Sequence, residues 1–177
     1  ADKAHAYELL QQSPYPTLVI PDQPYGQAIQ EGIVTARTTW VATMDADGQH
    51  TLQDLEALSW GSWADMIIGS RGLTWSPREL TSQALNLLAS ALMGQRVPDF
   101  GSGLRRFRRD IALRLLPLPI GFDFNAALTM AFLSTQAKVV WVPIPRRKRT
   151  AGRSHVRFMD GWTTLSTLVR SHDRQHP

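Results

Sequence analysis

The sequence contains no cysteine among its 177 residues. This absence excludes a disulfide framework, a zinc site with thiolate ligands and a cysteine nucleophile, and it suits a reducing compartment. Any bound metal must therefore be held by oxygen or nitrogen ligands. The candidate functional side chains are therefore carboxylates, amides, histidines and arginines.

A long hydrophobic run is also missing. A membrane-spanning helix needs about 20 mainly apolar residues, whereas the best candidate, residues 84–93, is short and includes Asn86 and Ser90. The first residues are charged and carry no apolar segment, so they do not read as a signal peptide. With 43% hydrophobic residues and a length typical of one domain, the chain is expected to form a single globular domain.

Neither sign of charge is in large excess. Lysine and arginine total 19 against 15 aspartates and glutamates, which gives a formal net charge of +4. That excess is too small to argue for nucleic-acid binding by itself. Its distribution is more informative, because cations gather in residues 146–157 and carboxylates in residues 45–65. We expect the first region to face anions and the second to hold a cation.

Short apolar runs alternate with helical patterns along the chain. Residues 17–20, 40–44, 65–68 and 138–144 are rich in Val, Ile, Trp and Thr and predict strands. Helices are predicted over residues 4–12, 26–36, 52–60, 77–92, 111–116 and 124–133. The alternation predicts an α/β fold, with a mainly parallel sheet flanked by helices.

Capping residues mark several of these helix starts. Residues 51–54 and 76–79 have the spacing of capping boxes, and Asp110 and Asp123 are candidate caps of the next two helices. Two of the helical segments are amphipathic. Their apolar stripes are Leu80, Ala84, Leu87, Leu88, Ala91 and Leu92 in one, and Phe158, Trp162, Leu165 and Val169 in the other. Packing on the sheet is favoured for each stripe, with membrane contact as the alternative.

The most informative segment is Asp45-Ala46-Asp47-Gly48-Gln49, which directly follows a predicted strand. Asp45, Asp47 and Gln49 share parity, so in an extended chain their side chains point the same way. Two carboxylates and an amide oxygen form an incomplete oxygen site that suits Mg²⁺ or Mn²⁺, with other positions left for water or phosphate. The plainer alternative is a pair of solvated turn carboxylates.

A second set of candidates follows the strand predicted at residues 65–68. Ligands of open α/β sheets bind beyond the carboxyl ends of the strands, so Arg71 is expected to face the same cleft. Arg78 lies in the first turn of the next helix, where N–H groups and the helix dipole favour a phosphate, and Ser82 follows one turn later. Together they predict an anion site, although each residue alone is more simply a surface residue.

A glycine-punctuated loop at residues 97–103 leads into a further short strand. Gly101 and Gly103 permit a close approach to the backbone. Three roles are open for the Asp99 carboxylate: contact with a sugar hydroxyl, action as a base, or hydrogen bonds to local N–H groups of a tight turn. This loop is the third candidate element of the site.

Six segments, taken in chain order, resemble those of family 2 glycosyltransferases, and the nearest type is the dolichol-phosphate (polyprenyl-phosphate) mannosyltransferases. They are residues 44–50, 67–71, Asp99 with 102–107, 121–124, 142–144 and 149–154. Each segment alone is a weak signal. The ordered set, which extends over residues 26–168, is specific.

The resemblance implies a GT-A fold and inverting transfer of a hexose from a nucleotide sugar to a polyprenyl phosphate. It assigns the acceptor phosphate to Arg71, Arg78 and Ser82. The complete site prediction has Asp47, Asp99 and Arg71 as catalytic residues, Arg78, Ser82, Gln49, Ser102, Arg149 and Ser154 as substrate-binding residues, and Asp45, Asp47 and Gln49 as ligands of Mg²⁺ or Mn²⁺. Mannose and glucose donors stay equally open.

Two departures from the family pattern affect this expectation. Residues 152–155 match a Gly-Glu-Ser-Lys motif, but Arg153 replaces the Glu and His155 replaces the Lys. The first two strands of the family, which grip the nucleotide, have no counterpart, so we expect a fragment or a degenerate copy. Residues 1–145 would form a truncated GT-A core, and residues 146–177 a basic segment and an amphipathic helix of the same domain.

Three functions are compared on this basis. The first is a glycosyltransferase at the cytoplasmic, inner face of a membrane, with its amphipathic helices on lipid and its cations on anionic headgroups. The second is a non-catalytic relative that binds a membrane surface or a partner. Nucleic-acid binding is the weakest of the three, because few aromatic residues interleave with the cations. The oligomeric state stays open.

Overall fold

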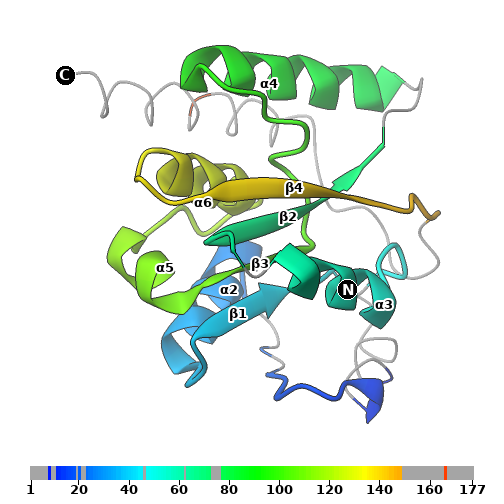
Figure 1. Ribbon diagram of the computed structural model, residues 1–177, viewed down its shortest axis with the longest axis vertical. Coiled ribbons are helices and arrows are strands. Elements are labelled where there is room, and N and C mark those ends of the chain that lie inside the picture. The colour runs from blue at the N-terminus through cyan, green and yellow to red at the C-terminus, as the bar shows by residue number, and fades with distance from the viewer. Residues whose placement is uncertain are drawn as a thin grey trace.

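The structure is a computed structural model, and it describes residues 8, 11–18, 20, 23–45, 47–61, 63–72, 77–148 and 166. The strands are β1 (Trp40–Thr43), β2 (Met66–Arg71), β3 (Arg105–Arg108) and β4 (Val139–Ile144). The helices are α2 (Tyr25–Thr35), α3 (Leu52–Ala57), α4 (Pro77–Met93), α5 (Arg109–Leu115) and α6 (Phe124–Leu133), and a 3₁₀ turn, η1 (Leu58–Gly61), continues α3. Figure 1 shows their arrangement.

The four described strands form one sheet in the order β1-β3-β2-β4. β2 pairs with β4 in parallel, whereas β3 lies antiparallel between β1 and β2. The predicted α/β fold is confirmed. β1, β2 and β4 run the same way, as expected for a mainly parallel sheet, but only the pairing of β2 with β4 is parallel. The sheet is nevertheless mixed, because β3 returns between them.

Helices cover both faces of the sheet. Met66, Ile68 and Phe107 project to one face, where they pack in a buried cluster with α2, α5 and α6. The intervening Ile67 projects to the other face and packs with Leu58 of η1. This alternation is the period-two pattern of a strand that is buried on both sides. It leaves the carboxyl ends of β1 and β2 free to carry a site.

The predicted elements are reproduced closely in the middle of the chain and less well near its start. Residues 17, 18 and 20 are not in a strand, and Leu18 is 53% exposed. The strand predicted at residues 17–20 is therefore wrong for these three residues. They lie between Pro16 and Pro21 in the sequence, and proline has no N–H group to donate to a β ladder. Of the helix predicted at residues 4–12, the described residues 8, 11 and 12 are helical.

The capping predictions have mixed outcomes. Thr51 and Asp54 form the predicted capping box at the start of α3, with reciprocal bonds between side chain and backbone. Asp110 lies inside the first turn of α5 and is not its cap. Asp123 occupies the N-cap position of α6 but makes no capping hydrogen bond. The box at residues 76–79 lies largely outside the described side chains.

The inner face of α4 packs on α6 and on the loop that precedes β3. Ala89 is buried in a cluster with Phe100, against which Leu85 also packs. Asn86 donates from Nδ2 to the Pro98 carbonyl at 2.8 Å and accepts from the Phe100 N–H at 3.3 Å. These bonds satisfy loop backbone that the helix buries. They fix which side of α4 faces the protein.

The opposite face of α4 is apolar and exposed, and we call it the outer stripe: Leu80, Ala84, Leu87 and Ala91. Leu80 is 51% exposed and Leu87 is 72% exposed. The prediction that these leucines pack on the sheet is therefore wrong. The reason is that Asn86 and the small residue Ala89 take the inward side of α4.

Gly26 sets the close contact between α2 and the segment that leads into α6. Its N–H donates to the Ile120 carbonyl at 2.8 Å. A Cβ atom at this position would lie 2.5 Å from the Pro119 carbonyl oxygen and 2.9 Å from the Cβ of Phe124. We expect Gly26→Ala to lower the free energy of unfolding by about 1–3 kcal/mol, because the backbone there cannot move aside.

Gly32 of the same helix provides the matched control. A Cβ atom there meets only Ile20 Cδ1, at 3.7 Å. Gly32→Ala is expected to be neutral or to stabilise by up to about 1 kcal/mol through helix propensity. Urea unfolding of both variants measures the difference, and equal stabilities would contradict the packing of α2.

Candidate functional site

Asp45 follows β1 and is held by a short hydrogen-bond chain from two helices. The Tyr25 hydroxyl of α2 donates to Asp45 Oδ1 at 3.3 Å and accepts from Asn125 Nδ2 of α6 at 2.8 Å. Burial, and then the charge of Asp45, raise the pKa of Tyr25 well above its ordinary value. The phenol is therefore protonated near neutral pH and acts as a hydrogen-bond donor to the carboxylate.

Gly103 leaves the space that the Asp45 carboxylate occupies. A Cβ atom on Gly103 would overlap all three atoms of this carboxylate. The carbonyl of Gly103 accepts from the Thr43 hydroxyl at 2.9 Å, which ties the glycine loop to β1. The predicted close approach at Gly103 thus has an identified partner, the first candidate metal ligand.

Asp47 and Gln49 form a tight turn behind Asp45. Asp47 is 7% exposed, and its Oδ1 accepts from the Gln49 N–H at 2.9 Å. The intervening Gly48 has a φ of 79°, a conformation that favours glycine. The side chain of Gln49 donates to the Arg147 carbonyl at 3.2 Å. The turn is therefore fastened to the start of the basic segment.

Arg147 strengthens this connection from its own side chain. Its guanidinium pairs with Asp54, the buried carboxylate of the α3 capping box. Asp54 therefore has a structural role, because it caps α3 and neutralises Arg147.

Arg71 and Asp99 form an ion pair across the site. Arg71 Nε donates to Asp99 Oδ2 at 3.0 Å and Nη2 donates to Oδ1 at 3.2 Å. The indole of Trp141 donates to the Asp99 carbonyl at 3.0 Å. Burial acts to lower the pKa of Arg71, but Asp99, and more weakly Asp45 and Asp47, outweigh it and raise the pKa above its ordinary value.

His50 directly follows the acidic turn in the chain and is buried. It is 2% exposed, and among the described residues neither of its ring nitrogens has a hydrogen-bond partner. Burial lowers the pKa of His50, although Asp45 and Asp47 act in the opposite direction. The side chain is thus buried, polar and unpaired at the end of β1.

A buried arginine supports the glycine loop from below. Arg105 is completely buried, and its guanidinium donates to the carbonyls of Phe100, Ser102 and Asn125 and to the Thr129 hydroxyl. Burial lowers the pKa of Arg105 to about 10, so it stays charged at neutral pH. Its role is to fasten the loop to α6, and through the loop to place Gly103 and Asp99.

The structure brings together five of the residues predicted from sequence: Asp45, Asp47, Gln49, Arg71 and Asp99. Ser102 is completely buried, with its hydroxyl accepting from the Leu104 N–H at 3.4 Å. Ser82 is exposed on α4. The side chain of Arg78, and both Arg149 and Ser154, lie outside the described residues, so their predicted roles stay predictions.

Four residues of this site were not predicted from sequence: Tyr25, His50, Arg105 and Asn125. His50 directly follows the acidic segment, and that position was its one available signal. The other three come from elements far away in the chain. Nothing in their local pattern indicates that they meet around Asp45.

The donor set fits a divalent ion that is shared with a ligand. Within the described part of the chain, no three histidine, aspartate or glutamate side chains gather closely enough to hold a metal alone. The Asp45 and Asp47 carboxylates with the Gln49 amide are hard oxygen donors, which suit Mg²⁺ or Mn²⁺. An incomplete protein shell is expected where phosphate oxygens and water supply the remaining ligands.

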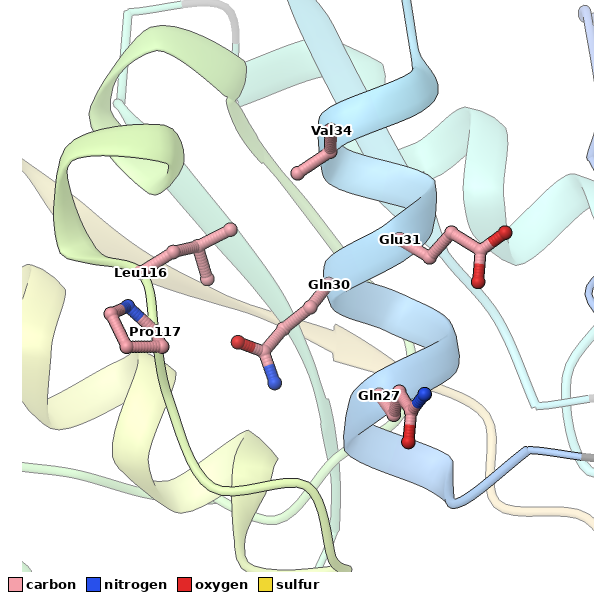
Figure 2. Close-up of a pocket in the computed structure, with 6 residues that line it drawn as sticks. All are labelled: Gln27, Gln30, Glu31, Val34, Leu116 and Pro117. Carbon is pink, nitrogen blue, oxygen red and sulfur yellow. The ribbon is translucent and has the colours of Figure 1, made fainter.

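A separate hollow lies between α2 and the segment that follows α5. It has a volume of about 550 Å³ and is lined by Gln27, Gln30, Glu31, Val34, Leu116 and Pro117 (Figure 2). The Gln30 amide is already bonded to the backbone of Leu118 through both its nitrogen and its oxygen. None of the acidic-site residues lines this hollow, and we assign no chemistry to it.

The mixed sheet, its covering helices and the acidic turn after β1 define an α/β fold of the GT-A glycosyltransferase type. Solved structures of glucosyl-3-phosphoglycerate synthase from Mycobacterium tuberculosis share it. One aligns with a TM-score of 0.66 at 16% identity, covering 94% of this chain and 59% of the synthase. The complex with Mn²⁺, uridine-diphosphate-glucose and phosphoglyceric acid gives 0.68 at 16% identity, over 93% of this chain and 58% of the synthase.

These similarities establish the fold. A third synthase structure, in complex with Mg²⁺ and uridine-diphosphate, aligns with a TM-score of 0.66 at 15% identity over 93% of this chain. The chain spans 58% of the length of that synthase. No protein-family model and no curated protein sequence matches the chain. Activity is therefore argued from the site itself.

Proposed function

We propose that this chain carries the metal-dependent catalytic site of an inverting glycosyltransferase, which moves a hexose from a nucleotide sugar to a phosphate-bearing acceptor. The observation that carries the proposal is the pair of carboxylates that follows β1, half-buried Asp45 and buried Asp47, within electrostatic reach of Arg71. The fold supports it, because solved structures of the same fold include complexes with Mn²⁺ and a nucleotide sugar.

Asp45, Asp47 and Gln49 are the residues that would hold Mg²⁺ or Mn²⁺. When bound, the ion supplies Lewis-acid stabilisation of the charge on the departing diphosphate. The protein orients the ligands: Tyr25 fixes Asp45 by a hydrogen bond, and the Gln49 N–H fixes Asp47. Preorganised ligands of this kind avoid reorganisation during the reaction.

Arg71 and Asp99 are proposed to serve the acceptor side. Asp99 orients the guanidinium through two hydrogen bonds, which favours a positioning role for this carboxylate over the predicted role of a base. An acceptor phosphate is anionic at neutral pH and attacks the anomeric carbon without a strong base. Arg71 would bind that phosphate and place it in line, and positioning supplies a large part of such a rate enhancement.

A polyprenyl phosphate is the acceptor that we favour. The outer stripe of α4 offers exposed leucine side chains, and residues 146–148 add cations near the acidic turn. An apolar helix face with nearby cations suits the inner, cytoplasmic face of an anionic membrane. No helix in the described ranges is long and apolar enough to cross a bilayer.

Two alternatives are distinguished by the same assay. The structural neighbours are named for a phosphorylated small acid as acceptor, which favours phosphoglycerate as the rival acceptor. A non-catalytic module that keeps the fold and binds a membrane surface or a partner is the second alternative. Mannose and glucose are both tested as donor sugars.

The test is transfer of labelled sugar from UDP- and GDP-linked glucose and mannose in the presence of Mn²⁺. Polyprenyl phosphate in anionic vesicles and soluble phosphoglycerate are offered separately. We expect label in the lipid fraction, dependent on Mn²⁺ and abolished by EDTA. Label on phosphoglycerate alone would replace the acceptor, and donor binding without turnover to either would favour the non-catalytic module.

Membrane contact has a matched control. Leu87→Ser removes the most exposed leucine of the outer stripe, whereas Val34→Ser removes a 58% exposed residue of α2. We expect flotation with anionic vesicles to decrease in the first variant and to persist in the second, because only the first loses buried apolar area at the membrane. Equal flotation would contradict a role of α4 at the membrane.

A further inference from the structure

Three buried side-chain polar atoms have no hydrogen-bond partner within the described ranges: Nδ1 and Nε2 of His50 and Oδ1 of Asn125. Both residues are linked to Asp45. His50 feels the charge of Asp45 and Asp47, and Asn125 is bonded to the Tyr25 hydroxyl that contacts Asp45. Each residue with an unsatisfied atom is therefore connected to Asp45, the first candidate metal ligand.

Buried polar groups in folded proteins are nearly always paired, and an exception calls for a missing water, ion or ligand. His50 is the stronger of the two signals, because both of its nitrogens are unpaired and the residue is 2% exposed. Asp45, Arg71, Asp47 and Asp54 all act electrostatically on the ring. A polar ligand bound by these charged groups would explain why the ring nitrogens of His50 have no hydrogen-bond partner within the described ranges.

We infer that His50 is a binding residue of this site, and that one of its ring nitrogens hydrogen-bonds to the diphosphate, or to the water shell, of a divalent cation held by Asp45 and Asp47. The inference rests on the proposed function and adds a residue to it. Direct coordination is not invoked, because His50, Asp45 and Asp47 do not form a three-residue metal cluster. The contact is therefore to the ligand around the ion.

The competing explanation is that His50 merely fills space in the core. An apolar side chain would then serve as well or better, because it removes two unsatisfied polar atoms from the interior. The two explanations predict the same direction for stability and opposite results for ligand binding. Stability and binding must therefore be measured on the same variants.

The experiment uses the full chain with two probes, Mn²⁺ alone and Mn²⁺ with inorganic pyrophosphate, which represents the diphosphate without a nucleoside. Binding is measured by calorimetry for the wild type, His50→Phe and His50→Gln. We expect His50→Phe to melt at or above the wild-type temperature and to lose about tenfold in pyrophosphate affinity, the equivalent of one hydrogen bond. His50→Gln, which keeps a donor and an acceptor, is expected to recover part of that loss.

A second measurement needs no folded variant. In ¹⁵N-labelled wild-type protein, the ring nitrogens of His50 are followed by NMR while Mg²⁺ and pyrophosphate are added. We expect one ring nitrogen to shift with the binding isotherm. Unchanged pyrophosphate affinity in a folded His50→Phe variant, or an imidazole that does not respond, would overturn the inference and leave the proposed function intact. A wild type that binds neither probe would overturn both.

Discussion

Asp47→Ala is expected to abolish the binding of Mn²⁺ and, with it, the binding of the nucleotide sugar. Removing partners outside the direct ligand shell typically costs 10- to 100-fold in metal affinity, so loss of a direct ligand should cost more than about 100-fold. The substitution also removes the acceptor of the Gln49 N–H. Isothermal calorimetry with Mn²⁺, and then with the donor, measures both effects.

Two variants separate the charge of Asp47 from its structural role. Asp47→Asn keeps an oxygen for the Gln49 N–H and removes the charge, so it should retain the turn and lose the metal. Asp110→Asn removes an exposed carboxylate that pairs with Arg108 and Arg114 on α5, and it should leave Mn²⁺ binding unchanged. If Asp47→Ala binds Mn²⁺ as the wild type does, the site lies elsewhere.

Gly103→Ala is expected to have the second-largest effect. The added methyl group would overlap the Asp45 carboxylate, so either the loop or Asp45 must move. Overpacking of this kind typically costs about 1–3 kcal/mol of stability. Displacement of a metal ligand should also lower the affinity for Mn²⁺ by at least about tenfold. Chemical denaturation and metal titration of the same sample detect both losses.

Gly101 is the matched control in the same loop. It is exposed, and a Cβ atom there would lie 4.0 Å from its nearest neighbour, Asp99 Oδ1. Gly101→Ala should therefore change stability by less than about 0.5 kcal/mol and leave the metal affinity unaltered. A similar loss in both variants would mean that loop flexibility, and not the space for Asp45, makes Gly103 necessary.

The sequence predicted those parts of the fold that local rules determine. The capping box at Thr51 follows from a residue pattern within one turn. The bounds of α6 agree with the helical pattern predicted over residues 124–133. The position of β3 between β1 and β2 does not, because strand order depends on packing between distant segments. The apolar face of α4 was misassigned for a related reason. Asn86 lies inward only because the loop at residues 97–100 offers it backbone partners.

The same division applies to the site. Asp45, Asp47 and Arg71 could be predicted because the two aspartates follow β1 and Arg71 is the last residue of β2, at the carboxyl edge of the sheet. Arg105 could not, since a charged residue is rarely expected to be completely buried. Its burial is possible because backbone carbonyls and a hydroxyl satisfy the guanidinium. Tyr25 was likewise hidden, because only the tertiary structure brings α2 to the end of β1.

The fold places candidate metal ligands after β1 and Arg71 at the end of β2. The outer stripe of α4 is exposed. The ion pair of Arg71 with Asp99 keeps the cation oriented before any ligand arrives. Under the proposed function, an acceptor phosphate would bind an arginine that is already oriented.

The most direct test of the central claim is a crystal of the full chain soaked with Mn²⁺ and a nucleotide sugar and measured at the manganese absorption edge. The account predicts one anomalous peak between the carboxylates of Asp45 and Asp47, in contact with the diphosphate of the donor. A peak at another place, or a bound donor whose diphosphate lies away from these two aspartates, would contradict it.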